Sequence, residues 1–138
     1  MLEFDPILLT GVDAIDAQHR ELFARVGALL EAARNRRSKD EVLRLVEFLG
    51  EYVVQHFADE EREMSRTAYP RAEAHRLEHR QLVKELEVLR QELATEGPTV
   101  LFVIRVGNRV TEWLREHIYR TDRLLGAWLR TPPSGGSA

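Results

Sequence analysis

The sequence predicts an all-α protein, an antiparallel up-down-up-down four-helix bundle with a short N-terminal arm. Three observations predict this fold. Apolar residues recur at helical spacing in four long segments, short polar or proline-containing breaks separate these segments, and no stretch shows the alternation of a half-buried strand. Because long helices joined by short connections pack beside one another in opposite directions, we expect the four segments to form one bundle.

The first two helices are expected in the N-terminal half of the chain. The first covers about 13–34, and a polar break follows over 35–38. Ser38 stands three residues before Glu41, which is the spacing of a capping box, so the second helix is expected to start there and to end near Arg66. The inward positions expected for the two helices are Ile15, Leu22, Phe23, Val26, Leu29, Leu30, Leu45, Leu49, Val53 and Phe57.

The other two helices are expected on either side of a glycine-proline break. Pro70 suits a first helical turn, and the third helix is expected to continue to about Thr95. Gly97-Pro98 ends it, and the fourth helix is expected over about 99–129. Their inward positions are Leu82, Leu86, Leu89, Leu93, Val103, Val106, Val110, Trp113 and Leu114.

Length and composition are those of one soluble domain. The 138 residues can bury a core of their own, with 1–130 as the domain and 131–138 (TPPSGGSA) as a flexible tail. A net charge of −3, with Lys and Arg spread along the chain, argues against a nucleic-acid partner. The absence of cysteine excludes disulfides and thiolate ligands, and no apolar run reaches the roughly 20 residues of a membrane span. The N-terminus has no basic region before its apolar stretch, so a cytoplasmic location is the default expectation.

Five histidines lie on or beside the apolar stripes of the predicted helices. They are His19, His56, His75, His79 and His117. A single histidine on such a stripe is most often a hydrogen-bonded core residue. In an antiparallel bundle, however, a rise of about 1.5 Å per residue places all five within a slab roughly 10 Å thick. Burying five imidazoles without a shared purpose costs too much free energy, so their common level indicates one site.

Two acidic residues are candidates to join the histidines. Glu60 follows His56 by four residues and shares its inward face, whereas Glu61 is rotated about 100° away and is expected to be a solvated charge. Asp122 follows His117 by five residues, a spacing that a regular helix turns about 140° off the face. Asp122 is therefore either a surface residue or is brought inward by a one-residue π-type bulge, a feature that favours functional sites. The spacing alone leaves both open.

Five imidazoles and two carboxylates are too many ligands for one metal ion. They suit two ions that the carboxylates bridge and the imidazoles ligate terminally. Ferritin-like di-iron sites instead use several Glu residues and two Glu-x-x-His motifs, and here no Glu stands three residues before a His. A nitrogen-rich set of this kind stabilises ferrous iron and supplies few groups for proton transfer.

Four segments carry the seven candidate ligands in a distinctive order. They are GVDAIDAQHRELF (11–23), HFADEEREM (56–64), HRLEH (75–79) and WLREHIYRTD (113–122). Together they span nearly the whole chain, and in order and spacing they strongly resemble the hemerythrin family, in particular the single-domain bacterial hemerythrins. Any one segment is a weak signal, but the ordered set of seven positions is highly specific.

The resemblance implies a hemerythrin-like domain with a non-haem di-iron site that binds O2 reversibly. The ligands it implies are His75, His79 and His117 for one iron, His19 and His56 for the other, and Glu60 and Asp122 as bridges beside an oxo or hydroxo group. The iron with two histidines is then one ligand short, and O2 would bind there. Because the family's last ligand also follows its histidine by five residues, the resemblance implies the bulge before Asp122.

A dry pocket is expected beside the open iron. Its expected lining residues are neighbours of the ligands along their helices: Leu22, Phe57, Trp113, Leu114 and Ile118. An apolar wall excludes water and slows the irreversible loss of bound oxygen. These residues also suit ordinary core packing, and both roles are compatible.

Three further positions have alternative interpretations. Phe4 stands where the resemblance leads us to expect a tryptophan, which affects the packing of the N-terminal arm rather than the site. Asp16 either accepts the second ring proton of His19 or caps the first helix. Tyr52 lies one turn from His56 and either reaches the pocket or packs in the core.

Three classes of function are compatible with these residues. The leading hypothesis is O2 binding for storage, delivery or sensing. The alternative is a di-iron enzyme that reduces O2, peroxide or nitric oxide, for which Tyr52 is the candidate proton donor. The third is a signalling module that docks an unknown protein partner on one helix face, since the chain has no room for an output domain.

Overall fold

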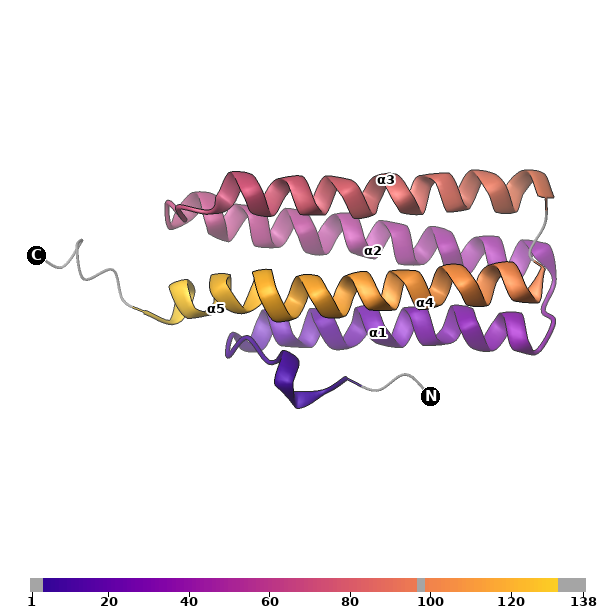
Figure 1. Cartoon of the computed structure of the whole chain (residues 1–138), viewed down its shortest axis with the longest axis horizontal. Helices are drawn as coiled ribbons and strands as arrows, with labels where there is room; N and C mark the ends of the chain where they lie inside the picture. The colour runs from indigo at the N-terminus through magenta and orange to yellow at the C-terminus, as the bar shows by residue number, and fades with distance from the viewer. Residues whose placement is uncertain (1–3, 97–98, 132–138) are drawn as a thin grey trace, which may run out of the picture.

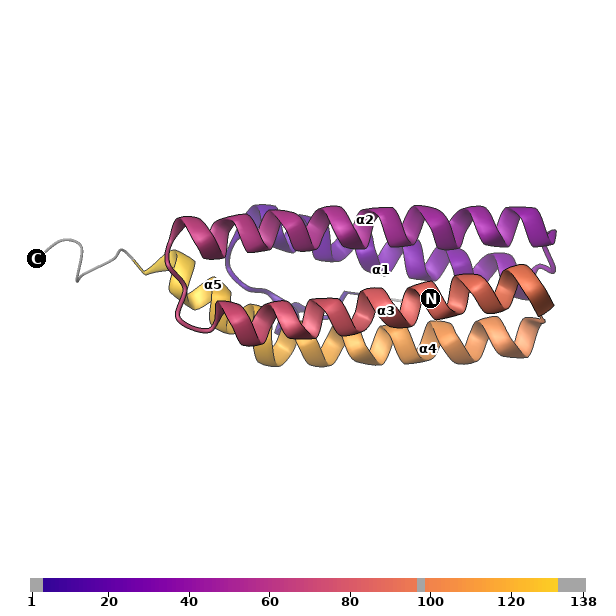
Figure 2. The same ribbon diagram turned by 90° about the horizontal axis from the view of Figure 1, so that it is seen from above.

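Four long antiparallel helices form the body of the protein, which confirms the predicted fold (Figures 1 and 2). The computed structural model describes residues 4–96 and 99–131. Its elements in chain order are the 3₁₀ helix η1 (Pro6–Leu8), α1 (Asp13–Arg34), α2 (Lys39–Arg66), α3 (Ala72–Glu96), α4 (Val100–His117), the π-helix η2 (Ile118–Asp122) and α5 (Arg123–Arg130). The fourth predicted helix is thus divided by a π turn. The predicted Gly97-Pro98 break and tail residues 132–138 lie outside the described residues.

Local backbone signals fix where the long helices begin and end. The Ser38 Oγ accepts a hydrogen bond from the backbone N–H of Glu41 at 3.2 Å, so the helix start predicted there is confirmed. Thr99 caps α4 in the same way. Just beyond α1 and α2, Arg36 and Ala68 each have a φ of 54°, the left-handed conformation that commonly terminates a helix. These tight ends allow each helix to run back along the one before it.

The core consists of two apolar clusters at different levels of the bundle. The larger one fills most of the bundle's length and includes Leu22, Leu49, Leu82 and Leu114, all almost fully buried. The smaller one closes one end of the bundle and contains Ile15, Met64, Tyr69 and Leu125. Along every helix the predicted ligands lie between residues of the two clusters, so the candidate site is enclosed by apolar packing on both sides. Among the described residues, no helix has the length and apolar character that crossing a bilayer requires.

The N-terminal arm is fastened to the end of the bundle that holds the site. Asp16 on α1 accepts hydrogen bonds from the backbone N–H and hydroxyl of Thr10, at 2.8 and 2.7 Å, and from the N–H of Gly11 at 3.2 Å. Asp16 therefore holds the arm, and the expectation that it caps the helix or supports His19 is wrong. Gly126 on α5 has no space for a side chain, because a Cβ there would lie 2.4 Å from the Thr10 carbonyl oxygen. Phe4 packs edge-on against the ring of Phe23.

Candidate metal centre

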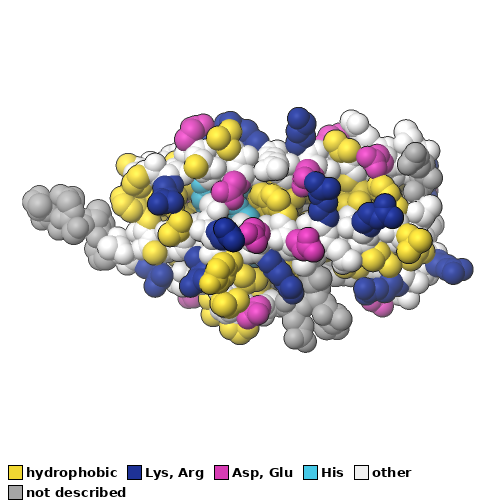
Figure 3. Space-filling model, in the orientation of Figure 1, with side chains coloured by type: hydrophobic (Ala, Val, Ile, Leu, Met, Phe, Trp, Pro, Cys, Tyr) yellow, Lys and Arg dark blue, Asp and Glu magenta, His cyan; other side chains and the backbone are white. Residues whose placement is uncertain are grey.

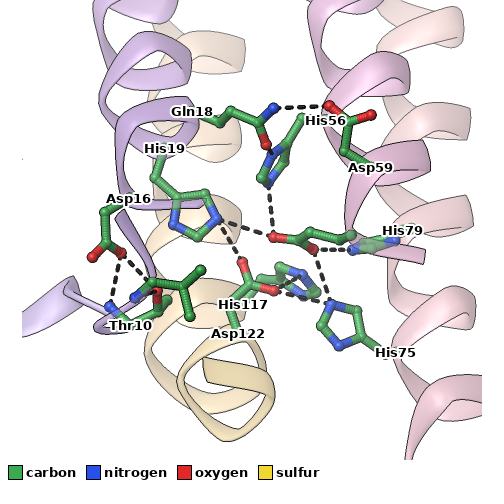
Figure 4. Close-up of polar contacts among 12 residues, drawn as sticks. Thr10, Asp16, Gln18, His19, His56, Asp59, His75, His79, His117 and Asp122 are labelled. Atoms are coloured by element: carbon green, nitrogen blue, oxygen red, sulfur yellow. Dashed lines mark hydrogen bonds and ion pairs between the residues drawn. The ribbon is translucent and has the colours of Figure 1, made fainter. Parts of the chain in front are cut away.

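Seven buried polar side chains converge between the two apolar clusters (Figure 4). None is more than 3% exposed. In chain order they are His19 from α1, His56 and Glu60 from α2, His75 and His79 from α3, His117 from α4 and Asp122 from η2. The structure therefore brings all seven predicted ligand positions together, from α1, α2, α3 and the divided fourth helix (α4 and η2).

Glu60 lies at the centre of this cluster and turns its two oxygens toward different histidines. Its Oε2 is 2.9 Å from His56 Nε2 and 3.3 Å from His19 Nε2. Its Oε1 is 3.2 Å from His75 Nε2 and 3.1 Å from His79 Nε2. One carboxylate thus contacts histidines on three helices, with a separate oxygen for each side of the cluster.

Asp122 completes the cluster from the π turn. Its Oδ2 is 2.9 Å from His19 Nε2, and its Oδ1 is 2.9 Å from His75 Nε2 and 3.1 Å from His117 Nε2. The helix assumes π geometry over Ile118–Asp122, between the last histidine and the aspartate. The extra residue in this turn cancels the rotation that a regular helix would give to the fifth position. The bulge that the resemblance implies is confirmed.

The contacts divide the cluster into two overlapping groups. The larger group is Glu60, His75, His79, His117 and Asp122, and the smaller is His19, His56, Glu60 and Asp122. Within each group one potential ligand atom per residue lies within 4.8 Å of all the others. Both Asp122 oxygens are buried without a well-oriented hydrogen bond from any described residue. Buried oxygens without donors, facing imidazole nitrogens, are the arrangement that metal ions complete.

Three of the five histidines are supported by a common pattern across the helices. Each donates its Nδ1–H to a polar side chain on the preceding helix. The pairs are His56 with Gln18 at 2.6 Å, His79 with Glu61 at 2.8 Å and His117 with Glu78 at 2.7 Å. A hydrogen bond at Nδ1 fixes the tautomer that leaves the Nε2 lone pair directed at the centre, as metal ligation requires. Nδ1 of His19 and of His75 has no hydrogen-bond partner among the described residues.

Glu61 is not the solvated charge that its place in the sequence predicts. Its side chain is 33% exposed, and its Oε2 accepts the hydrogen bond from His79. The rotation of Glu61 on α2 was predicted correctly, but α3 occupies the space on that side. Gln18 and Glu78 were missed for the same reason. The available signal was adjacency, because each of these three residues stands next to a ligand in the sequence yet supports a histidine on another helix.

The aromatic residues near the cluster pack against its three-histidine side. Phe57 stacks on His79 with ring centroids 3.7 Å apart, and Trp113 stacks on His117 at 4.6 Å. Phe57 is buried and also lies 5.8 Å from the ring of His56, so it borders both groups. The remaining members of the predicted pocket are fully buried in the larger core cluster: Leu22, Leu114 and Ile118. Apolar packing is thus shown for this wall, and its role toward O2 stays a prediction.

Tyr52 packs away from the cluster. The Arg25 guanidinium lies over its ring, 4.5 Å from the centroid, and burial raises the pKa of the Tyr52 hydroxyl. The ring is partly buried against the larger core cluster. No described hydrogen bond joins Tyr52 to any of the seven residues. The core interpretation of Tyr52 is therefore the better one, and the alternative enzyme hypothesis loses its candidate proton donor.

A solvent-facing cavity adjoins the cluster between α3 and the C-terminal part of the fourth helix. Its volume is about 300 Å³, and its lining residues are Tyr69, Arg71, Ala74, His75, Glu78, Glu116, Arg120, Thr121 and Leu124. Histidine atoms are visible from outside on this face of the molecule (Figure 3). His75 is the member of the seven-residue cluster that lines this cavity, so the cavity borders the edge of an otherwise buried site.

Mutual charge stabilisation shifts the pKa values of the cluster strongly. Burial alone lowers the pKa of His19, but the close polar contacts and negative charges of Asp122 and Glu60 raise it to about 9. The same balance raises the pKa of His75 to about 9 and that of His117 to about 10. For Glu60 and Asp122 burial raises the pKa, yet the surrounding histidines hold both values well below the ordinary range. Without metal, protons hold this cluster together, and a metal ion has to displace them.

We expect the metal-free protein to lose stability as pH rises from 6.5 to 10. A histidine whose folded pKa exceeds the unfolded value of 6.5 stabilises the fold below pH 6.5, and this stabilisation disappears as pH rises through the folded pKa. The loss should reach at least about 2 kcal/mol, since one pKa unit corresponds to about 1.4 kcal/mol. Urea unfolding of the metal-free protein at pH 6.5, 8 and 10 measures it.

Zinc-loaded protein is the control for this experiment. Metal ligation requires neutral imidazoles, so its stability should rise or remain level over the pH range in which that of the metal-free protein falls. A free energy of unfolding that is the same at pH 6.5 and pH 10 in the metal-free protein would contradict the proton-held cluster.

Comparisons with known proteins identify the family of the chain. The family model described as the hemerythrin HHE cation-binding domain matches residues 10–129. A bacteriohemerythrin from Methylococcus capsulatus is 33% identical over 87% of this chain and 89% of its own length. A bacteriohemerythrin from Clostridium acetobutylicum is 28% identical over 82% and 89%.

Solved structures are similar to this chain as well. A wild-type hemerythrin crystal structure superposes with a TM-score of 0.78 and 30% identity, over 88% of this chain and 92% of that chain. The region that the family model matches contains the whole cluster. The chain therefore belongs to the hemerythrin family.

Proposed function

We propose that this protein holds two iron ions and binds O2 reversibly, for oxygen storage, delivery or sensing. The observation that carries the proposal is the division of the two carboxylates. One oxygen each of Glu60 and Asp122 faces the three-histidine group, and the other oxygen of each faces the two-histidine group. Two carboxylates that share their oxygens in this way are suited to bridging a pair of metal ions.

The five histidines would be distributed unequally between the two ions. The assignment is His75, His79 and His117 to one ion and His19 and His56 to the other, with an oxo or hydroxo group completing the bridge. The second ion has one protein ligand fewer, and this is the position proposed for O2. When bound, a ferrous pair supplies two electrons for reversible O2 binding, and hemerythrin-family membership favours iron at this donor set.

The protein's own residues would keep water and protons away from that position. Leu22, Leu114 and Ile118 are almost fully buried, and Phe57 covers part of both groups. Tyr52, the hydroxyl considered as a proton donor, packs elsewhere. A wall of this kind would favour release of O2 over its reduction, which supports a carrier rather than an enzyme.

The visible spectrum of iron-loaded, reduced protein tests the proposal. We expect a colourless solution under argon, a coloured one in air, and return to the colourless form after purging with argon. Iron analysis should give about two ions per chain, one for each group of histidines.

Two other outcomes would change the assignment. Rapid passage in air to an oxidised spectrum that argon does not reverse would favour the di-iron enzyme, or a sensor that responds once per oxidation. Less than about one iron per chain, with unchanged folding after chelation, would contradict a di-iron protein altogether.

A further inference from the structure

Glu78 contacts both ends of the irregular turn that delivers Asp122. Its Oε1 accepts a hydrogen bond from His117 Nδ1 at 2.7 Å, and His117 is the last residue of α4. The Thr121 hydroxyl, inside the π turn, donates to the same carboxylate, 2.9 Å from Oε1 and 3.1 Å from Oε2. A single side chain from α3 therefore spans the extra residue in the fourth helix.

This turn needs an external support for two reasons. A π turn is rare and less favourable than regular helix, and reverting to α geometry would rotate Asp122 away from the cluster. The turn also lies beside the 300 Å³ cavity, whose lining includes Glu78 and Thr121, so water can reach the hydrogen-bonding groups there. The Glu78 carboxylate accepts hydrogen bonds from both ends of the turn, so it gives these groups a fixed partner in place of water.

The other supporting residues do not have this geometry. Gln18 and Glu61 each accept from one histidine, and each of those histidines lies within a regular α-helix. Glu78 alone among these three also holds a residue of η2. Its hydrogen bonds to His117 and Thr121 show that it lies on the α3 face toward the fourth helix.

We propose that Glu78 is a positioning residue that holds the π turn, and through it Asp122, in addition to orienting His117. Metal ligation by Asp122 rests on the function proposed above, whereas the support of the turn does not. Because Asp122 belongs to both groups, releasing the turn weakens the binding of both metal ions. By contrast, removing the hydrogen-bond partner of a histidine that belongs to one group should weaken mainly the binding of the ion in that group.

Three substitutions separate the parts of this role. Thr121→Val removes the hydroxyl at nearly constant shape and leaves the His117 contact intact. Glu78→Ala removes both contacts, and Glu78→Gln keeps an oxygen that accepts from both partners but removes the charge. Glu61→Ala is the matched control, because it deprives His79 of its partner without touching the turn. Glu73→Gln, on the exposed surface of α3, is the background control.

The first measurement is amide hydrogen exchange over 118–122 in the metal-free protein. We expect exchange at least about 10-fold faster in Thr121→Val and Glu78→Ala, and within about 3-fold of wild type in Glu78→Gln and Glu61→Ala. The second is titration with Co²⁺, followed by its visible absorption. In Glu78→Ala and Thr121→Val we expect both ions to bind about 10- to 100-fold more weakly. In Glu61→Ala we expect weaker binding of one ion and unchanged binding of the other.

Each of the two measurements tests a different part of the proposal. Unchanged exchange over 118–122 in both Thr121→Val and Glu78→Ala would overturn the proposal, whatever the metal binding shows. Faster exchange together with unchanged affinity for both cobalt ions would overturn the link from the turn to Asp122. If wild-type protein bound no metal, the proposed function would fail, while the exchange data would still decide whether Glu78 holds the turn.

Discussion

Replacing Glu60 by glutamine is expected to abolish stable binding of both metal ions. Glu60 contacts His19, His56, His75 and His79, so one substitution removes one of the two proposed ligands that both groups share. Loss of an outer-sphere partner typically costs about 10- to 100-fold in affinity, and loss of a bridging carboxylate should exceed about 100-fold. Iron analysis after loading and desalting should fall from about two ions per chain to less than one, and the air-dependent colour should disappear.

The same substitution should destabilise the metal-free protein in a pH-dependent way. Near pH 6.5 it leaves the protonated histidines with Asp122 as their one remaining buried counter-charge in the cluster, at an expected cost of about 3–5 kcal/mol. Near pH 10 His19 and His75, with pKa values of about 9, are largely neutral and His117, with a pKa of about 10, is only half protonated, so the cost should shrink. Glu63→Gln is the control on the same helix, where an exposed pair with Arg66 predicts a change within about 0.5 kcal/mol. Two tightly bound irons in the Glu60→Gln protein would refute the bridging role.

The bundle was predictable because helical periodicity is a local signal. The apolar stripe of α2 continues through His56 to Glu60 without a change of phase, so the inward face of that helix could be followed up to the ligands themselves. Helix ends were predictable where a side chain determines them, as at Ser38. The π turn was different, because a five-residue spacing permits either a surface aspartate or a bulge. The hemerythrin resemblance, rather than periodicity, indicated the correct alternative.

The pairing of the histidines with their partners was not predictable, because adjacency to a ligand marks Gln18, Glu61 and Glu78 but the histidine that each supports depends on contacts between helices. Whether Glu61 is solvated or bound to His79 depends on how α3 is placed against α2, and a small shift between them would break a 2.8 Å contact. Asp16 shows the opposite case. It stands three residues before His19, but the N-terminal arm supplies three donors and occupies its carboxylate. Rotation on a single helix predicts which residues face inward, and the packed structure determines which of them meet.

Replacing Phe57 by alanine is expected to cost about 3–5 kcal/mol of folding free energy, the usual range for a buried Phe. The side chain is 4% exposed and stacks on His79, so its removal leaves a cavity against a metal-ligand candidate. In iron-loaded protein, water entering this cavity should hasten the irreversible loss of the air-induced colour. Urea unfolding of the metal-free protein and repeated air–argon cycles of the loaded protein measure the two effects separately.

Two variants of α2 distinguish the role of Phe57 beside the metal centre from the general effect of removing a large side chain. Phe48→Ala removes the same side chain from the same helix at a position that is 49% exposed, and we expect a loss below about 1 kcal/mol with unchanged colour cycling. Phe57→Leu refills most of the space without an aromatic face, so it should recover much of the stability. If it also recovers the cycling lifetime, exclusion of water is the function of this position. If stability returns and the lifetime does not, the stacked ring itself is required, because it holds His79 in the orientation that Glu61 sets through the Nδ1 hydrogen bond.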